Sequence, residues 1–262
     1  MSNIKISDLS FAYEQQEKLI LKDINVEVKT GEFVCILGQS GCGKSTLLRL
    51  LAGLEKPTAG ELLIDGQLVD GTSLERGVVF QDYGLFPWMT AGENIVLALK
   101  QRFPEQNKTE LKQIAMNMMQ AVGLSEDVYK RLPKELSGGM KQRCAIAQVF
   151  AMNPPVLLMD EPFGALDAVT RARLQDLVLE LWKRDEEKKN VFFVTHDVDE
   201  ALLLANRIIV LGQSPGNIIY DISISDDKRP TRETQFEDPK VFQMRNELIR
   251  QMNKDIKPEE DK

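Results

Sequence analysis

The sequence has few cysteines, few aromatic residues, a single histidine and no long apolar segment. Its three cysteines, Cys35, Cys42 and Cys144, show no metal-site spacing, which favours a reduced cytosolic compartment. No apolar run approaches the ~20 residues that a membrane-spanning helix needs, and the N-terminus lacks the pattern of a signal peptide. We therefore expect a protein that is soluble by itself and meets a membrane only through a partner.

The charge balance is mildly acidic. The chain has 33 Lys and Arg against 40 Asp and Glu, a net charge of -7, which argues against a nucleic-acid-binding protein. Its 262 residues, 43% of them hydrophobic, suffice for one large domain or a domain with a subdomain.

The central motif is a glycine-rich loop between an apolar run at 33–37 and a helical apolar pattern at 47–52. The loop consists of Gly38, Gln39, Ser40, Gly41, Cys42, Gly43, Lys44, Ser45 and Thr46. The G-x-x-x-x-G-K-S pattern between a strand and a helix predicts a P-loop that binds a nucleoside triphosphate. The alternative, a plain glycine turn, is disfavoured by the length of the pattern.

The residue types of this loop suit polyphosphate chemistry. Glycines let backbone N–H groups turn inward, and the following helix N-terminus adds partial positive charge. Lys44 supplies a full charge to the outer phosphates, and Ser45 offers a hydroxyl to Mg²⁺. Cys42 is interpreted as a tolerated small residue, with a redox switch as the alternative.

Strands are predicted around this motif. Residues 4–28 and 61–66 have strand patterns, and the isolated aromatic Tyr13 is assigned by pattern alone to a core or hairpin. Residues 77–82 predict a strand that ends at Gln81. Ligands bind at strand carboxyl ends in open α/β sheets, although a solvated loop glutamine is the alternative.

Between about 88 and 150 the pattern predicts helices, at 95–99 and 111–122 among others, and we interpret this region as an inserted helical subdomain. Ser137, Gly138 and Gly139 precede a further helix. They predict either a simple helix start or a second anion-binding helix N-terminus.

Two acids follow an apolar strand at 156–160. Continuous apolarity is typical of a parallel strand that is buried on both faces. Asp160 and Glu161 at its end suit Mg²⁺ binding and water activation respectively, and their place downstream of a P-loop strengthens this interpretation.

The last third of the chain predicts an amphipathic helix with Leu174, Leu177, Val178 and Leu181 facing inward. A charge run at 183–189 is interpreted as a solvated face, and a buried strand at 191–195 ends before His196. A lone histidine is usually structural, but this one shares a strand-end position with Gln81 and Glu161.

The C-terminal region starts with a strand at 208–211. Residues 213–240 are interpreted as loop-rich, 241–249 as a short helix and 257–262 as a disordered tail.

Together the P-loop, Leu136–Gly139, Val156–Glu161, Ala165–Asp167 and His196 resemble the ATPase subunit of an ABC transporter. The resemblance covers about residues 4–212. It implies an α/β fold with a P-loop NTPase core, a mostly parallel sheet, an antiparallel β subdomain and the inserted helical subdomain at about 88–150. We expect an ABC ATPase domain at 1–212 and a C-terminal extension at 213–262.

The resemblance also implies roles for single residues. Tyr13 would stack on adenine, Gln81 would sense Mg²⁺ or the attacking water, and His196 would contact the γ-phosphate. Lys44 and Mg²⁺ on Ser45 and Asp160 would neutralise charge while Glu161 polarises the water. Two further groups complete the expected nucleotide site, namely the signature residues Ser137, Gly138 and Gly139, and Asp167.

The family further implies partners: a second ATPase subunit in a head-to-tail dimer that holds two ATP molecules, a transmembrane permease and an extracytoplasmic solute-binding protein. The protein would then work at the cytoplasmic face of the cell membrane. Leu85–Trp88 and Ser214–Gly216 look similar to importers of nitrate, sulfonates and taurine, although Phe86 and Gln148 depart from that pattern. Two alternatives are a soluble ABC ATPase that acts as a mechanical clamp and a nucleotide binder without turnover.

Overall fold

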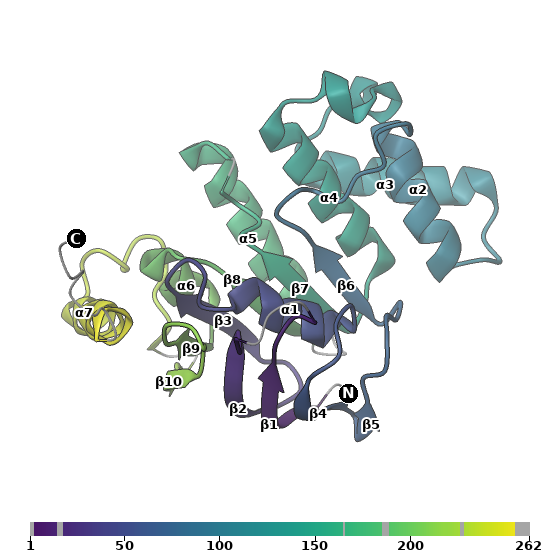
Figure 1. Cartoon of the computed structure of the whole chain (residues 1–262). Helices are drawn as coiled ribbons and strands as arrows, with labels where there is room; N and C mark the ends of the chain where they lie inside the picture. Colours follow the sequence, from purple (N-terminus) through teal and green to yellow (C-terminus); the bar gives the residue numbers. More distant parts are fainter. Residues whose placement is uncertain (1–2, 15–17, 165, 185–188, 226–227, 255–262) are drawn as a thin grey trace, which may run out of the picture. The chain divides into compact units, whose positions relative to one another are not determined.

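The computed structural model describes residues 3–14, 18–164, 166–184, 189–225 and 228–254. The chain divides into two compact units (Figure 1). One unit combines Met1–Thr72 with Asn190–Lys262, and the other is Ser73–Lys189.

The first unit contains an antiparallel sheet with the strand order β2-β1-β4-β5. Its strands are β1 (Ile4–Phe11), β2 (Leu21–Val28), β4 (Ala59–Ile64) and β5 (Gln67–Leu68). Along β2, Ile24, Val26 and Val28 are buried and alternate with exposed residues, as the sequence predicts. The expected antiparallel subdomain is therefore present.

The same unit holds the strand order β10-β9-β3-β8, in which β3 pairs in parallel with both β8 and β9. The strands are β3 (Phe33–Gly38), β8 (Asn190–Val194), β9 (Arg207–Leu211) and β10 (Ile218–Ser223). All residues of β3 and β8 are buried, as expected for central parallel strands.

Strand β10 corrects one interpretation, because a loop-rich segment was expected at 213–240. It pairs antiparallel with β9, and its residues are half-buried or exposed. Arg207 of β9 stabilises the strand pair, because its guanidinium donates to Asp221 of β10 at 2.8 and 2.9 Å. The same guanidinium donates to Glu32, just before β3, at 2.9 Å. These carboxylates raise the pKa of Arg207.

The described part of this unit also contains the α-helices α1 (Lys44–Ala52), α6 (Val198–Leu204) and α7 (Pro239–Asn253). Helix α7 is longer than the segment expected at 241–249, because Asp238 caps its start by accepting from the Lys240 N–H at 2.8 Å. The tail at 257–262 lies outside the described residues.

The second unit holds the parallel strands β6 (Arg76–Val79) and β7 (Val156–Asp160), in register from Arg76↔Val156 to Val79↔Met159. The helices around them form the helical region of the chain. They are α2 (Ala91–Arg102), α3 (Lys108–Ala121), α4 (Gly138–Met152) and α5 (Ala168–Arg184), with short 3-10 turns at Glu126–Lys130 and Pro133–Glu135.

Two interpretations of this unit need correction. Leu174 and Val178 of α5 are buried, but Leu177 and Leu181 are only half-buried. Lys189, expected on a solvated face, is 7% exposed and donates to the Asn153 side chain, and burial lowers its pKa. Among the described residues, no helix is both long and apolar enough to cross a membrane.

Candidate active site

The glycine-rich loop runs from the end of β3 at Gly38 to the start of α1 at Lys44. Gly41 and Gly43 have φ angles of 79° and 100°, in the left-handed region that side chains disfavour. A Cβ at Gly43 would also lie 2.6 Å from Leu21 Cδ2. Helix α1 has no side-chain cap and no acid in its first turn, so this helix end is suited to an anion.

Lys44 is the only cation in the first turn of α1 and is 7% exposed. Its Nζ donates to the carbonyl oxygens of Gly38 and Gln39, both at 2.9 Å. The loop backbone therefore holds the ammonium over the loop itself, where a phosphate oxygen would also meet it.

Tyr13 lies beside this loop rather than in an isolated core position. Its hydroxyl is 3.4 Å from Thr46 Oγ1, and its ring packs edge-on against Phe11 with the centroids 4.9 Å apart. An open groove lined by Phe11, Tyr13, Leu54 and Thr58, among others, borders the ring. The half-buried ring is thus placed where an adenine could stack.

Cys42 is 2% exposed within the loop and is a free thiol, like Cys35 and Cys144. Burial raises the pKa of the Cys42 thiol, although the charge of Lys44 acts in the opposite direction. A buried, protonated thiol reacts slowly with oxidants, which supports the interpretation as a small packing residue.

His196 follows β8 within the same unit. Ile36 of β3 pairs with Val194 of β8, and the Thr195 N–H donates to the Ile36 carbonyl at 3.3 Å. Parallel pairing therefore brings the carboxyl end of β8, with His196, next to the β3 end that carries the P-loop. The P-loop, Tyr13 and His196 belong to one unit.

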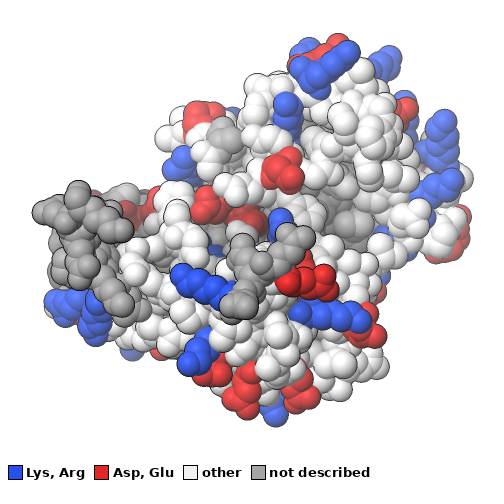
Figure 2. Space-filling model, viewed as in Figure 1, with Lys and Arg blue, Asp and Glu red and all other residues white. Residues whose placement is uncertain are grey.

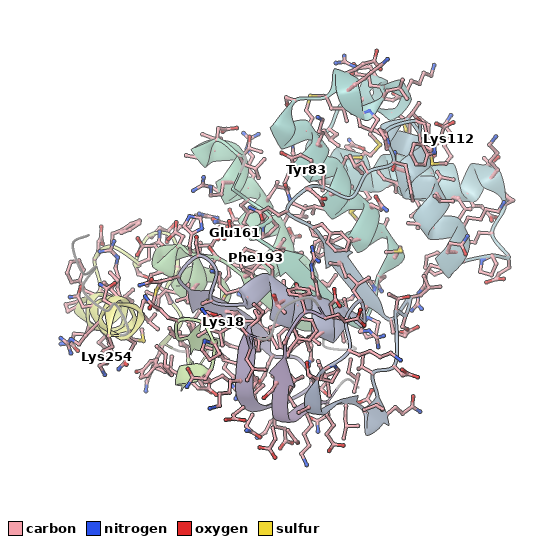
Figure 3. All side chains as sticks on the ribbon, viewed as in Figure 1. Lys18, Tyr83, Lys112, Glu161, Phe193 and Lys254 are labelled. Atoms are coloured by element: carbon pink, nitrogen blue, oxygen red, sulfur yellow. The ribbon has the colours of Figure 1, made fainter. Side chains whose placement is uncertain are left out.

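In the second unit, Asp160 closes β7 and Glu161 follows it (Figure 3). Glu161 has a φ of 45°, a strained value for a side-chain-bearing residue. The Gly164 N–H donates to the Glu161 carbonyl at 3.3 Å, so the chain turns sharply directly after the two acids.

Gln81 lies beyond the adjacent strand β6, which ends at Val79 rather than at Gln81. This corrects the expected strand end. Because Val79 pairs in parallel with Met159, the segment after β6 lies at the same end of the strand pair as Asp160 and Glu161. Gln81 is exposed, and Tyr83, two residues later, has a φ of 72°.

Ser137 is the N-cap of α4, with its Oγ accepting from the Met140 N–H at 3.3 Å. Ser137 and Gly138 are exposed and Gly139 is half-buried. The structure confirms the predicted helix start. An anion-binding site at this helix N-terminus stays a prediction.

Asp167 caps α5 by accepting from the N–H groups of Val169 and Thr170 at 3.1 and 3.0 Å. These contacts, first that with Thr170, lower the pKa of Asp167. The Asp167 carboxylate therefore stabilises the start of α5, in addition to any contact that it makes with a nucleotide. Ala165 lies outside the described residues.

Sequence reasoning missed Asn94, which is fully buried in α2. Its Oδ1 accepts from the Phe86 N–H at 2.7 Å, and its Nδ2 donates to the carbonyls of Phe86, Met89 and Thr90 at 3.3, 3.1 and 2.9 Å. This side chain fixes the backbone of 86–90. Its place directly before the apolar run Ile95–Leu99 was the available signal.

A parallel-stranded α/β fold with a complete P-loop defines the class: this is a P-loop nucleotide-binding protein. The family profile described as "ABC transporter" matches residues 21–164. The chain belongs to the ABC transporter family.

Two curated relatives are similar over most of their length. The nitrate import ATP-binding protein NrtD of Synechococcus elongatus is 44% identical over 230 residues, which are 87% of this chain and 83% of that protein. The bicarbonate transport ATP-binding protein CmpD of Synechocystis sp. is 41% identical over 228 residues, 87% of this chain and 80% of that protein.

A solved structure carries the same fold. The dimeric ATP-binding cassette MJ0796 in a post-hydrolysis state, bound to ADP and Pi, gives a TM-score of 0.77 at 33% identity, over 85% of this chain and 99% of that chain. The protein is therefore an ATP-binding cassette that hydrolyses ATP.

Proposed function

We propose that this protein is the ATP-hydrolysing subunit of an importer that takes up nitrate, bicarbonate, sulfonate, taurine or a similar small solute through a separate permease. An extracytoplasmic solute-binding protein would deliver the solute to that permease. The names of the relatives support this direction, since they are nitrate import and bicarbonate transport proteins. The ATPase would work at the cytoplasmic face of the membrane.

The hydrolytic roles follow the chemistry of the described residues. Lys44 and the N–H groups at the start of α1 bind the phosphates, and Tyr13 stacks on the base. Glu161 polarises the water that attacks the γ-phosphoryl group in line, and His196 contacts that group. Gln81 senses the attacking water.

The donor set suits Mg²⁺ that arrives with the nucleotide. Magnesium usually uses one or two protein oxygens beside substrate phosphates, and Asp160 with the Ser45 hydroxyl are such donors. Among the described residues, no group of three His, Cys, Asp or Glu side chains forms an all-protein cage. Bound Mg²⁺ would supply charge neutralisation on the phosphates.

Two copies would work together. The comparison cassette MJ0796 is dimeric, and in a head-to-tail pair the exposed Ser137 and the half-buried Gly139 would reach the ATP held by the other copy. A homodimer is the simplest form of this arrangement.

The observation that carries the transport proposal is an exposed aromatic pair after β6. Trp88 is 72% exposed and Phe86 41%, with ring centroids 5.4 Å apart. Asn94 holds the backbone beneath them, so this apolar surface is preformed. Large exposed aromatics on a fixed backbone are typical of a protein contact, and we assign a helix of the permease as the occupant.

The test is co-purification of the tagged protein from detergent-solubilised native membranes, with mass spectrometry of its partners. Trp88→Ala should reduce recovery of a multi-span permease at least about 10-fold, since a buried aromatic anchor contributes more than ~2 kcal/mol. Phe236→Ala, which removes an aromatic residue that is 66% exposed, is the matched control and should leave recovery unchanged.

Cross-linking in membranes should place the permease near residues 82–105. Recovery of soluble or nucleic-acid partners alone would contradict the importer and favour a mechanical clamp.

A further inference from the structure

Helix α7 packs on α6 and β9 within the first unit, with Val241 and Leu248 3% and 2% exposed (Figure 1). Two polar contacts also connect it to elements of the nucleotide site. One is near its C-terminal end, just before Lys254, which Figure 3 labels, and the other is about two turns earlier.

The first contact reaches the P-loop. Gln39 Nε2 donates to the Met252 carbonyl in the last turn of α7 at 3.3 Å, and Gln39 Oε1 accepts from Gln213 Nε2 at 3.1 Å. The nitrogen and the oxygen of the Gln39 side-chain amide are thus both hydrogen-bonded to residues from the C-terminal part of the chain, Met252 and Gln213. The backbone carbonyl of Gln39 in turn accepts from Lys44 Nζ at 2.9 Å.

The second contact reaches the start of α6. Arg245 Nε donates to Asp199 Oδ1 at 2.7 Å. Asp199 lies in the first turn of α6, where Asp197 accepts from the N–H groups of Asp199 and Glu200 at 2.9 and 3.2 Å. His196 directly precedes this cap.

The packing beneath α7 is incomplete. A cavity of about 210 Å³ lies between the helix and the sheet, lined by Leu202, Ile208, Tyr220, Met244 and Leu248, among others. Side chains that line this half-open pocket lack protein contacts on one side, so apolar packing alone fixes the helix less firmly there. The polar contacts of Arg245 and Met252 therefore contribute more to fixing the orientation of α7.

We propose that α7 positions the catalytic site of its own chain, holding the P-loop at Gln39 through Met252 and the His196 segment at Asp199 through Arg245. Arg245 is a positioning residue, since it acts through Asp199. This inference rests on the roles proposed for Lys44 and His196.

The two contacts predict different kinetic changes. Loss of the Arg245 contact should lower kcat for ATP hydrolysis about 3-fold to 10-fold with KM within about twofold, because a charged hydrogen bond positions a transition-state group. Loss of the Met252 contact should raise KM for ATP about 2-fold to 5-fold with kcat nearly unchanged, because it positions the binding loop.

The first experiment is a double-mutant cycle. Arg245→Met and Asp199→Asn should each lower kcat, and the double variant should lower it no further, since both remove one interaction. Arg250→Met is the matched control, because Arg250 is exposed on the same helix and pairs only with Glu247 in the described structure. Arg245→Lys should restore part of kcat.

The second experiment uses truncation. A chain that ends after Gln251 loses the Met252 acceptor, whereas a chain that ends after Lys254 keeps it and serves as the control. Thermal melting of every variant separates loss of folding from loss of positioning. A parental KM in the shorter chain would overturn the P-loop contact.

His196→Ala separates this inference from the proposed function. If His196→Ala loses turnover while Arg245→Met keeps the parental kcat, positioning by α7 is wrong and the proposed site stands. If His196→Ala hydrolyses ATP at the parental rate, the role of His196 is wrong, and so is its positioning by Arg245. Additive losses in the double-mutant cycle would also overturn the inference.

Discussion

Helices α1 and α4 both begin after glycine-containing motifs, yet their first turns are satisfied in different ways. At α1 the N-cap is Gly43 in a left-handed conformation with φ 100°, no side chain caps the helix, and the buried Lys44 opens the first turn. At α4 the N-cap is Ser137 in an extended conformation, and its hydroxyl already accepts from Met140.

This difference matches two kinds of anion binding. The start of α1 has no side-chain cap and carries the full charge of Lys44, so it is suited to bind phosphate within its own chain. The start of α4 is satisfied and exposed, but the Ser137 hydroxyl still has a proton to donate. It is suited to a phosphate that another molecule brings.

The face drawn in Figure 2 carries intermixed acidic and basic side chains.

The largest effect on ATP hydrolysis is expected at Glu161, which lies in neither helix. Glu161→Gln should keep ATP affinity within about threefold but lower turnover at least about 100-fold, because it removes the carboxylate that we propose as the group polarising the water. Parallel ATPase assays and ATP titrations measure the two effects, and size-exclusion chromatography with ATP should show a trapped dimer. An unchanged hydrolysis rate would exclude Glu161 as the base.

Lys44→Ala tests the preorganised helix end. We expect ATP affinity to fall about 10-fold to 100-fold, since charged hydrogen bonds are worth ~1.5–3 kcal/mol. Equilibrium titration with ATP on the isolated protein checks this value. Ser137→Ala is the comparison and should leave the affinity of the isolated protein for ATP within twofold. Equal losses of affinity in the two variants would show that the starts of α1 and α4 do not differ in how they bind phosphate.

Ser137→Asp separates the cap of α4 from its proposed contact with ATP. Aspartate is a good N-cap, so the thermal midpoint should stay near that of the parent. Its charge repels phosphate, so steady-state turnover should fall about 10-fold or more. Parental turnover in Ser137→Asp would show that this helix end meets no phosphate.

The smallest effect is expected at a helix start outside the site. Asn107 caps α3 by accepting from Thr109 and Glu110 at 2.9 and 3.1 Å. Asn107→Ala should lower the free energy of unfolding by ~1 kcal/mol with ATPase activity unchanged. Denaturant unfolding and the ATPase assay provide the two readouts, and a loss of activity would show that cap loss by itself disturbs the site.

Local patterns predicted the elements that position the site. The continuous apolar runs of β3, β7 and β8 are buried as expected, and Ser137 caps its helix. The prediction worked here because burial on both faces and capping depend on few neighbouring residues.

Interpretations failed where distant partners decide the outcome. Strand β10 is half-exposed and has weak apolar patterning, so it exists through pairing with β9 and through Arg207. Lys189 looked solvated within a charge run but is buried against Asn153, 36 residues away along the chain. Strand β6 stops at Val79, before the expected end at Gln81.

The sequence by itself determined the class of this protein, because the phosphate-binding loop is continuous along the chain and its glycines and lysine act on neighbouring backbone. Only the tertiary structure decided which residues contact that loop and the start of α6 after His196. The contacts of Gln39 with Met252 and of Asp199 with Arg245 join positions 213 and 46 residues apart. Such pairs leave no local pattern, since they form only after the strands have paired and α7 has packed against the sheet.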